Sequence, residues 1–230
     1  MLRLGLLAAL VVLCNACSGG LQIIERPIPF SPNRIAHTQQ YIAQHYGLAA
    51  KDISITPRII VLHWTAIADL EGSYRAFAPE MLPNSRPELQ SAGQVNVSIQ
   101  FLIDKDGAVY RLMPENWMAR HCIGLNYESI GVENVGGEGG LDNLTEAQLA
   151  ANINLIRHLV KKYPTLQYLI GHHEYQVFEG HPLWREKDSA YRTSKTDPGE
   201  RFMSAVRAAI HDLRLKGAAE IAAEKTTAQP

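Results

Sequence analysis

Side chains that could bind a metal stand at the ends of several predicted strands. His63 directly follows a short apolar run, His172 follows another after Gly171, and Glu133 lies within a third such run. Lys195 and Asp197 come after the last of these runs. Ligand sites in open α/β sheets gather at strand ends, so residues far apart in the sequence can converge there. Two imidazoles and one carboxylate would form a zinc site with an open fourth position for water, the arrangement of a catalytic metal.

Spacing alone leaves this interpretation open. The chain contains nine histidines among 230 residues, and two of them will often fall near strand ends by chance. A histidine outside a metal site is usually a hydrogen-bonded core or surface residue. The residues by themselves therefore allow either a zinc site or histidines with a structural role.

Short apolar runs predict the strands that would position these residues. Residues 59–62, 130–135 and 166–170 are too short for helices, which favours buried strands. Residues 95–103 and 108–112 predict a hairpin, because an Asp-Gly pair supplies a turn between them.

Helical periodicity predicts the elements that cover this sheet. The first helix spans residues 34–46 and ends at Gly47, a typical C-terminal cap. The clearest helix begins after Thr145, which forms a capping box with Gln148, and Pro164 stops it. Its predicted inner face consists of four apolar residues: Leu149, Ile153, Ile156 and Val160.

The whole pattern predicts one fold class. A last helix is predicted over residues 200–216, and residues 81–94, with two prolines, predict a surface loop. Strands that alternate with helices predict an α/β fold, in which a mixed central β-sheet is covered by helices. The chain is 46% hydrophobic and 20% charged, which excludes a disordered or fibrous protein. Its net charge of −1 gives no electrostatic case for nucleic-acid binding. We expect a monomer.

The N-terminal residues predict export. Residues 1–16 combine a basic start with an apolar run of about ten residues, which fits a signal peptide and is short for a membrane span. Ala16 before Cys17 resembles a bacterial lipobox, whose cysteine is lipidated, although Cys14 stands where lipoproteins usually carry Leu. We expect a lipoprotein anchored on the periplasmic face of the outer membrane. The alternative is a soluble periplasmic protein with a simply cleaved signal.

Composition also divides the rest of the chain. Residues 17–32, rich in Gly, Pro and Ser, predict a tether, and residues 33–216 predict one folded domain. Residues 217–230 are polar and alanine-rich, which predicts a flexible tail. Cys122 has no obvious partner, so we expect a buried thiol and not half of a disulfide.

Six sequence blocks occur in the order seen in one family. The blocks are residues 60–66 (IVLHWTA), 101–112 (FLIDKDGAVYRL), 129–133 (SIGVE), 144–148 (LTEAQ), 171–172 (GH) and 195–199 (KTDPG). With them the chain resembles the zinc-dependent N-acetylmuramoyl-L-alanine amidases of type 2, which share a fold with peptidoglycan recognition proteins and amidase-type phage lysozymes. The resemblance covers roughly residues 59–202 and implies this fold.

The resemblance implies one zinc ion per chain, held by His63, His172 and Asp197. Members that only bind peptidoglycan have lost the third ligand, so Asp197 implies an enzyme. A non-catalytic peptidoglycan-binding lipoprotein is the main alternative. His173 competes for the role of second ligand, but the family's ligand directly follows the glycine at the strand end, which favours His172.

The resemblance also implies a reaction and the residues that perform it. Glu133 matches the general base or acid, and Lys195 matches a residue placed to stabilise the oxyanion. His121 matches a histidine that lines the substrate cleft, and Trp64 is a further candidate for substrate binding. The implied reaction is hydrolysis of the amide bond between N-acetylmuramic acid and L-alanine in peptidoglycan or muropeptides. A zinc peptidase or an exported amidase toxin on the same scaffold remains an alternative.

Three departures from the family pattern concern the substrate. Gln100 and Arg120 stand where many relatives have His and Trp, respectively. The third departure is an insertion over about residues 174–194. It is either a surface loop with its own small hydrophobic cluster or a lid or saccharide platform. In the second interpretation Trp184 is the aromatic side chain that covers a sugar ring.

Overall fold

The structure, a computed structural model, describes residues 20–83, 87–90 and 92–227. The predicted signal peptide, residues 1–16, and the predicted lipidation site Cys17 lie outside these ranges. Within them, none of the helices combines the length and the apolar character that crossing a membrane would require.

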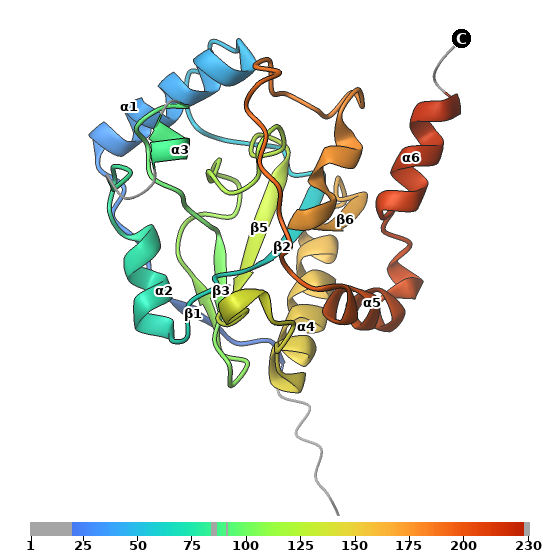
Figure 1. Ribbon diagram of the computed structural model, residues 1–230. Coiled ribbons are helices and arrows are strands. Elements are labelled where there is room, and N and C mark those ends of the chain that lie inside the picture. The colour runs from blue at the N-terminus through green and yellow to red at the C-terminus, as the bar shows by residue number, and fades with distance from the viewer. Residues whose placement is uncertain (1–19, 84–86, 91, 228–230) are drawn as a thin grey trace, which may run out of the picture.

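A six-stranded mixed sheet forms the centre of the fold (Figure 1). The strands lie in the order β1 (Ile23–Glu25), β4 (Val109–Arg111), β3 (Phe101–Ile103), β5 (Ser129–Asn134), β2 (Ile59–Trp64) and β6 (Tyr168–Gly171). All neighbours are parallel except the hairpin of β3 and β4. The predicted α/β fold with a mixed central sheet is therefore confirmed.

The first strand of the hairpin is shorter than predicted. Of residues 95–103 only the last three pair as a strand. The backbone N–H groups of Asn96 and Ser98 donate instead to the carbonyls of Glu80 and Arg120, which belong to irregular segments. Because of these irregular pairings, β3 begins only at Phe101.

The helices and short helical turns surround the sheet. They are α1 (Pro32–Tyr41) with the π-helical turn η1 (Ile42–Tyr46), α2 (Leu70–Phe77), α3 (Pro87–Gln90), η2 (Glu138–Gly140), α4 (Glu146–Lys162), η3 (His172–Phe178), α5 (Glu200–Ala209), η4 (His211–Leu213) and α6 (Ala218–Thr227). The helix predicted over residues 34–46 begins slightly earlier, because Ser31 accepts hydrogen bonds from the N–H groups of Asn33 and Arg34. It ends as predicted at Gly47, whose φ of 63° is left-handed.

α4 and α5 pack together on one face of the sheet (Figure 1). The capping box of Thr145 and Gln148 is present at the start of α4. The predicted inner face is confirmed in part: Ile156 is fully buried, and Leu149, Ile153 and Val160 are partly buried against the same core. The prediction missed Leu155 and Leu159, which are fully buried. Two polar residues, Gln148 and Asn152, are also fully buried. The buried face of α4 is therefore rotated from the face that the apolar pattern indicated.

The other face is covered by α1, η1, η3 and long loops. Tyr41, Ile42 and Phe178 are buried there against Val61 and Ile170 of the sheet. Cys122 is a buried free thiol in the same core, as predicted. The fold is thus a sheet between two layers, with the loop layer on the face that carries the site.

Segments predicted as loop, tether and tail join this fold. Residues 81–94 contain α3, and Leu82 and Leu89 are buried. Within the predicted tether, residues 17–32, β1 pairs with β4 and Ile28 is buried. The sequence did not reveal β1 because three residues show no alternation.

The C-terminal segment also differs from prediction. The helix predicted over residues 200–216 breaks after Ala209, and Arg214 adopts a left-handed φ of 53°. The predicted flexible tail, residues 217–230, contains α6, whose Ile221 is fully buried. A single buried side chain in an alanine-rich run gives no helical periodicity, so composition predicted a tail where packing makes a helix.

Candidate metal centre and the cavity beside it

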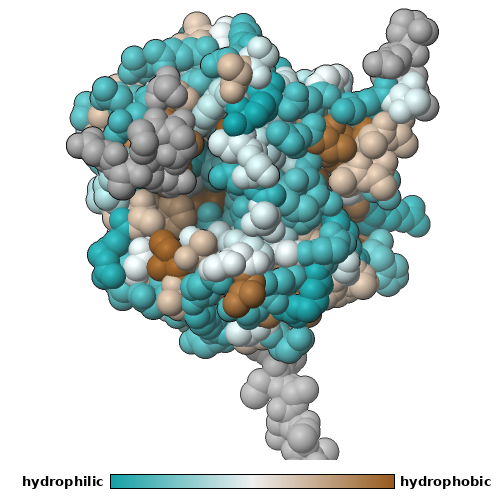
Figure 2. All heavy atoms as spheres, in the orientation of Figure 1, coloured by the Kyte–Doolittle hydropathy of each residue, from teal (hydrophilic) through white to brown (hydrophobic). Residues whose placement is uncertain are grey.

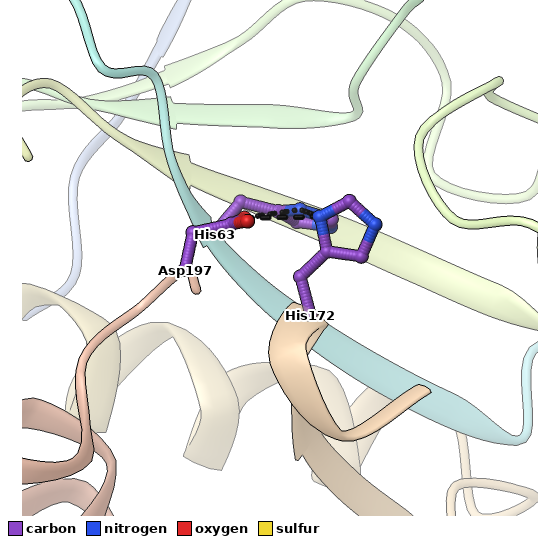
Figure 3. Close-up of side chains that lie close together, drawn as sticks. All are labelled: His63, His172 and Asp197. Carbon is purple, nitrogen blue, oxygen red and sulfur yellow. Dashed lines mark hydrogen bonds and ion pairs between the residues drawn. The ribbon is translucent and has the colours of Figure 1, made fainter. Parts of the chain in front are cut away.

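Three side chains from distant parts of the sequence converge at the ends of β2 and β6 (Figure 3). His63 is on β2, His172 directly follows β6, and Asp197 lies between the insertion and α5. Nδ1 of His63 lies 3.0 Å from Nδ1 of His172 and 3.2 Å from Oδ2 of Asp197. Nδ1 of His172 lies 3.0 Å from the same Oδ2. The structure therefore brings together the three predicted ligands.

These distances fit a zinc ion. Tetrahedral zinc with bonds of about 2.0 to 2.2 Å separates two of its ligand atoms by roughly 3.3 Å. The three observed separations, 3.0 to 3.2 Å, match one face of such a tetrahedron. In the part of the chain that the structure describes, no other group of three His, Cys, Asp or Glu side chains comes as close together.

Protonation states at neutral pH also suit a metal. Burial lowers the pKa of His172 to about 4, so its imidazole is neutral at pH 7. Burial alone would raise the pKa of the Asp197 carboxyl, but the imidazoles of His172 and His63 outweigh it and hold this pKa well below its usual range. A metal needs a neutral imidazole and an ionised carboxylate, and His172 and Asp197 offer these at neutral pH.

Buried amides of α4 and β5 fix the backbone of the first ligand. Asn152 donates from Nδ2 to Oδ1 of Asn134 over 2.7 Å, and Nδ2 of Asn134 donates to the carbonyl of His63 over 3.0 Å. Asn134 and Asn152 are fully buried. Asn152, a polar residue on the buried face of α4, thus holds the end of β2 in place through Asn134.

The neighbour of the second ligand holds the third. The backbone N–H of His173 donates to the carbonyl of Asp197 over 2.8 Å, and Nδ1 of His173 lies 3.2 Å from the same oxygen. The ring of His173 is therefore engaged with the backbone, whereas the ring of His172 meets the Asp197 carboxylate. This arrangement agrees with the choice of His172 over His173.

A cavity of about 600 Å³ opens beside the three ligands, and Figure 2 shows a recess in this face of the molecule. Glu133, Lys195, His121 and Trp64 line it together with His172 and Asp197. Glu133 is the in-register neighbour of His63 across β5 and β2, so the two side chains stand on one face of the sheet. The volume of the cavity suits a small ligand or one end of a larger one.

Two departures from the family pattern have structural partners. Gln100 is fully buried, donates to the carbonyl of Trp117 over 2.9 Å and accepts from the N–H of Gly131 over 2.8 Å. Arg120 donates to four backbone carbonyls and to the hydroxyl of Tyr191. Both side chains hold loops against the sheet, and Arg120 also lines the cavity.

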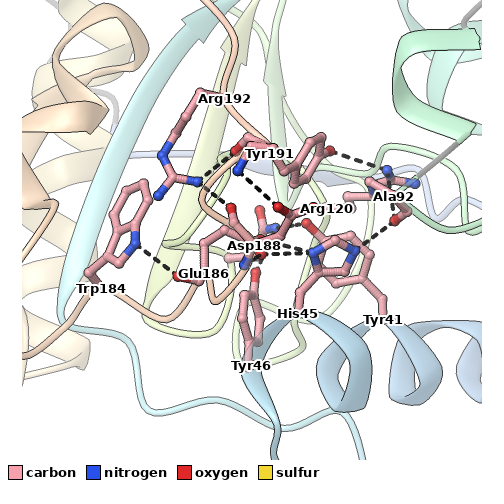
Figure 4. Close-up of polar contacts among 12 residues, drawn as sticks. Tyr41, His45, Tyr46, Ala92, Arg120, Trp184, Glu186, Asp188, Tyr191 and Arg192 are labelled. Carbon is pink, nitrogen blue, oxygen red and sulfur yellow. Dashed lines mark hydrogen bonds and ion pairs between the residues drawn. The ribbon is translucent and has the colours of Figure 1, made fainter.

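The insertion, residues 174–194, belongs to the main core. Tyr175, Phe178 and Tyr191 are buried, which corrects the interpretation as a surface loop. Figure 4 shows its polar anchors. Nδ1 of His45 lies 3.0 Å from both carboxylate oxygens of Glu186.

The structure does not bring Trp184 into the cavity, which corrects its interpretation as a saccharide platform. Its ring stacks on Tyr175, lies under the guanidinium of Arg192 and covers Gly124, where a Cβ would be 2.7 Å from the indole. Its Nε1 donates to the carbonyl of Glu186 over 3.1 Å. Trp184 therefore packs the insertion against the loop before β5.

Trp184→Ala is expected to lower the free energy of unfolding by roughly 2 kcal/mol, because it leaves a cavity beside Tyr175. Hydrolysis of short and long substrates should change by the same factor. Chemical denaturation and parallel assays on both substrate classes measure this, with Trp184→Phe as the conservative control. Unchanged stability together with a selective loss of hydrolysis on long glycan would instead support the interpretation of Trp184 as a saccharide platform.

Sequence reasoning missed two contributions to the site. The hydroxyl of Tyr175 accepts from the N–H of Thr193 over 2.9 Å and donates to its carbonyl over 2.7 Å, which positions the segment that leads to Lys195. Tyr191 lines the cavity and contacts Arg120. No local pattern marks either role, because both depend on where the insertion packs.

Comparison with known proteins identifies the family. The family described as N-acetylmuramoyl-L-alanine amidase matches residues 53–200. The N-acetylmuramoyl-L-alanine amidase LysC from Clostridium intestinale URNW is 21% identical with a TM-score of 0.50, and the match covers 83% of this chain and 97% of LysC. A selenomethionine derivative of AmpD is also 21% identical with a TM-score of 0.50, covering 81% and 93% of the two chains.

The solved structures share the fold of this chain, and no curated protein matches it in sequence. The family match spans well over half of the chain. It includes β2, β5 and β6 and the three side chains that converge at their ends. The chain belongs to the N-acetylmuramoyl-L-alanine amidase family.

Proposed function

We propose that this amidase is a zinc-dependent hydrolase that cleaves the amide bond between N-acetylmuramic acid and L-alanine in peptidoglycan or muropeptides. The observation that carries the proposal is the convergence of His63, His172 and Asp197 within 3.2 Å of one another beside a cavity. A protein that only binds the polymer needs the cavity but not a complete set of metal ligands.

The residues of the chain divide the work between them. Zinc, when bound, supplies positive charge that activates water and polarises a carbonyl. Glu133 faces the same cavity as the ligands, where it can take the proton of the attacking water and deliver it to the departing amine. Lys195 lines the cavity two residues before Asp197 and can stabilise the negative charge that develops on the lactyl oxygen.

Mass spectrometry of a peptidoglycan digest tests the function. With the purified protein we expect free stem peptides that begin with L-alanine and glycan strands without them. A chelator should abolish their release, and added zinc should restore it. Products cut within the glycan or within the peptide would refute the bond assignment, and full activity in the chelator would refute zinc dependence. Binding without any cleavage would support a non-catalytic lipoprotein.

Lys195→Met is expected to lower kcat by about 100-fold with a smaller change in KM, because the ammonium acts on charge that develops in the transition state. Steady-state kinetics on a soluble muropeptide measure both constants. Lys187→Met, on the exposed surface of the insertion, is the matched control and should match the wild type. A change confined to KM would argue against the oxyanion role.

We also propose that Cys17 carries a lipid anchor that retains the protein at the periplasmic face of the outer membrane. Cys17→Ser should then release the protein into the soluble periplasm, while Cys14→Ser should remain with the membrane fraction. Firm retention needs more than one acyl chain, as the multiple chains of a bacterial lipoprotein supply. Fractionation and blotting measure the distribution, and unchanged membrane retention of Cys17→Ser would refute the anchor.

A further inference from the structure

His63 has a second ring contact on the side away from the other ligands. Its Nδ1 faces His172 and Asp197, while its Nε2 lies 2.9 Å from Nδ1 of His121. The rings of His63 and His121 meet edge to face, with an interplanar angle of 82°. An imidazole that binds a metal through one nitrogen carries its hydrogen on the other. Nε2 of His63 is therefore the donor in this contact.

The direction of this hydrogen bond determines the rest of the chain of contacts. If Nδ1 of His121 accepts, a neutral His121 carries its hydrogen on Nε2. That atom lies 3.1 Å from Oγ of Ser129, and Ser129 donates in turn to the carbonyl of Leu125 over 2.8 Å. Every donor in the series meets one acceptor, and the series ends at a backbone carbonyl.

A side chain of the following loop holds the backbone of His121 in place. The N–H groups of His121 and Cys122 both donate to Oδ1 of Asn126, over 2.8 and 2.7 Å.

The sheet leaves a slot for this ring. A Cβ at Gly131 would lie 2.8 Å from Nδ1 and 2.9 Å from Cγ of His121, so only glycine fits beneath it. Gly131 stands between Ser129 and Glu133 on the same face of β5. Its N–H is held by Gln100. One face of β5 thus carries three residues that serve the site. Ser129 accepts the hydrogen bond of His121, Gly131 leaves space for the ring of His121, and Glu133 is the proposed base.

We propose that His121 is a positioning residue for the metal centre: it holds His63 in the orientation and tautomer that present Nδ1 to the metal, and Ser129 in turn holds His121. This inference rests on the proposed zinc site and adds to it, since the family resemblance assigns His121 only to the lining of the cleft. The role acts through His63 and requires no contact with substrate.

Zinc affinity, measured by competition with a fluorescent chelator, tests this role without reference to turnover. Loss of a residue that supports a ligand typically weakens metal binding 10 to 100-fold, and we expect His121→Ala to raise the zinc Kd by this factor. His121→Asn places an amide oxygen near the position of Nδ1 and should restore the Kd to within a few-fold of the wild type. His158→Ala, an exposed histidine on α4, is the matched control.

Long-range ¹H–¹⁵N spectra of the zinc-loaded wild-type protein test the tautomers directly. Both His63 and His121 should appear with hydrogen on Nε2. A His121 ring that is doubly protonated or carries its hydrogen on Nδ1 would overturn the proposal. This measurement does not depend on whether the variants fold.

The two experiments separate this inference from the proposed function. Wild-type protein that binds no zinc would refute the metal centre itself. Wild-type protein that binds zinc, together with a folded His121→Ala of unchanged Kd, would refute only the positioning role. If His121→Ala does not fold, Ser129→Ala takes its place and should weaken zinc binding several-fold, and an unchanged Kd there would count against the proposal.

Discussion

His63→Ala, His172→Ala and Asp197→Ala are each expected to leave the purified protein without zinc and without measurable amidase activity. The wild type should hold about one zinc ion per chain. Each substitution removes one of three atoms that lie 3.0 to 3.2 Å apart, and two ligands form a much weaker site than three. We expect zinc affinity to fall by more than about 100-fold, because changes behind the ligands alone cost 10 to 100-fold.

Elemental analysis after dialysis against metal-free buffer measures the zinc content, and circular dichroism verifies the fold. His173→Ala is the matched control, because it removes the adjacent imidazole but keeps the backbone N–H that binds the Asp197 carbonyl. It should retain zinc close to the wild-type content. Full zinc in His172→Ala together with loss of zinc in His173→Ala would reverse the assignment of the second ligand.

Local signals in the sequence were sufficient for the elements that carry the site. Thr145 and Gln148 mark the start of α4 through side chains that bind each other's backbone, which depends on only four residues. The short apolar runs around β2 and β6 marked buried strands, and parallel strands end at the same edge of a sheet. The convergence of His63 and His172 follows from these two facts.

Long-range contacts decided the parts that sequence reasoning did not predict. The inner face of α4 includes Gln148 and Asn152 because the sheet offers partners for their amides, and an apolar pattern does not reveal such partners. Trp184 packs against the core, and the pair of Arg185 and Glu128 over 2.7 Å likewise ties the insertion to the loop before β5.

One functional feature was present in the sequence without being used. Ser129, Gly131 and Glu133 alternate along β5, so they share the face that carries His63 on the neighbouring strand. A glycine between two polar residues on a strand indicates a close approach by another group. Here that group is the ring of His121.

Glu133→Gln is expected to lower the rate of hydrolysis by about two to four orders of magnitude, the usual contribution of a general base. The amide has the size of the carboxylate but cannot accept the proton of the attacking water. Glu133 is not one of the three converging ligands, so zinc content should stay at about one per chain. The free energy of unfolding should also change little. Single-turnover hydrolysis of a soluble muropeptide isolates the chemical step from product release.

The outcome of Glu133→Gln separates three roles for this carboxylate. Loss of rate with zinc retained supports the proton-transfer role, because the ligands remain and only the base is missing. Loss of both rate and zinc would make Glu133 a support of the metal centre, and an unaffected rate would remove it from the mechanism. Glu138→Gln is the matched control: that residue lies on η2, pairs with Lys105 and does not line the cavity, so its loss should leave the rate unchanged.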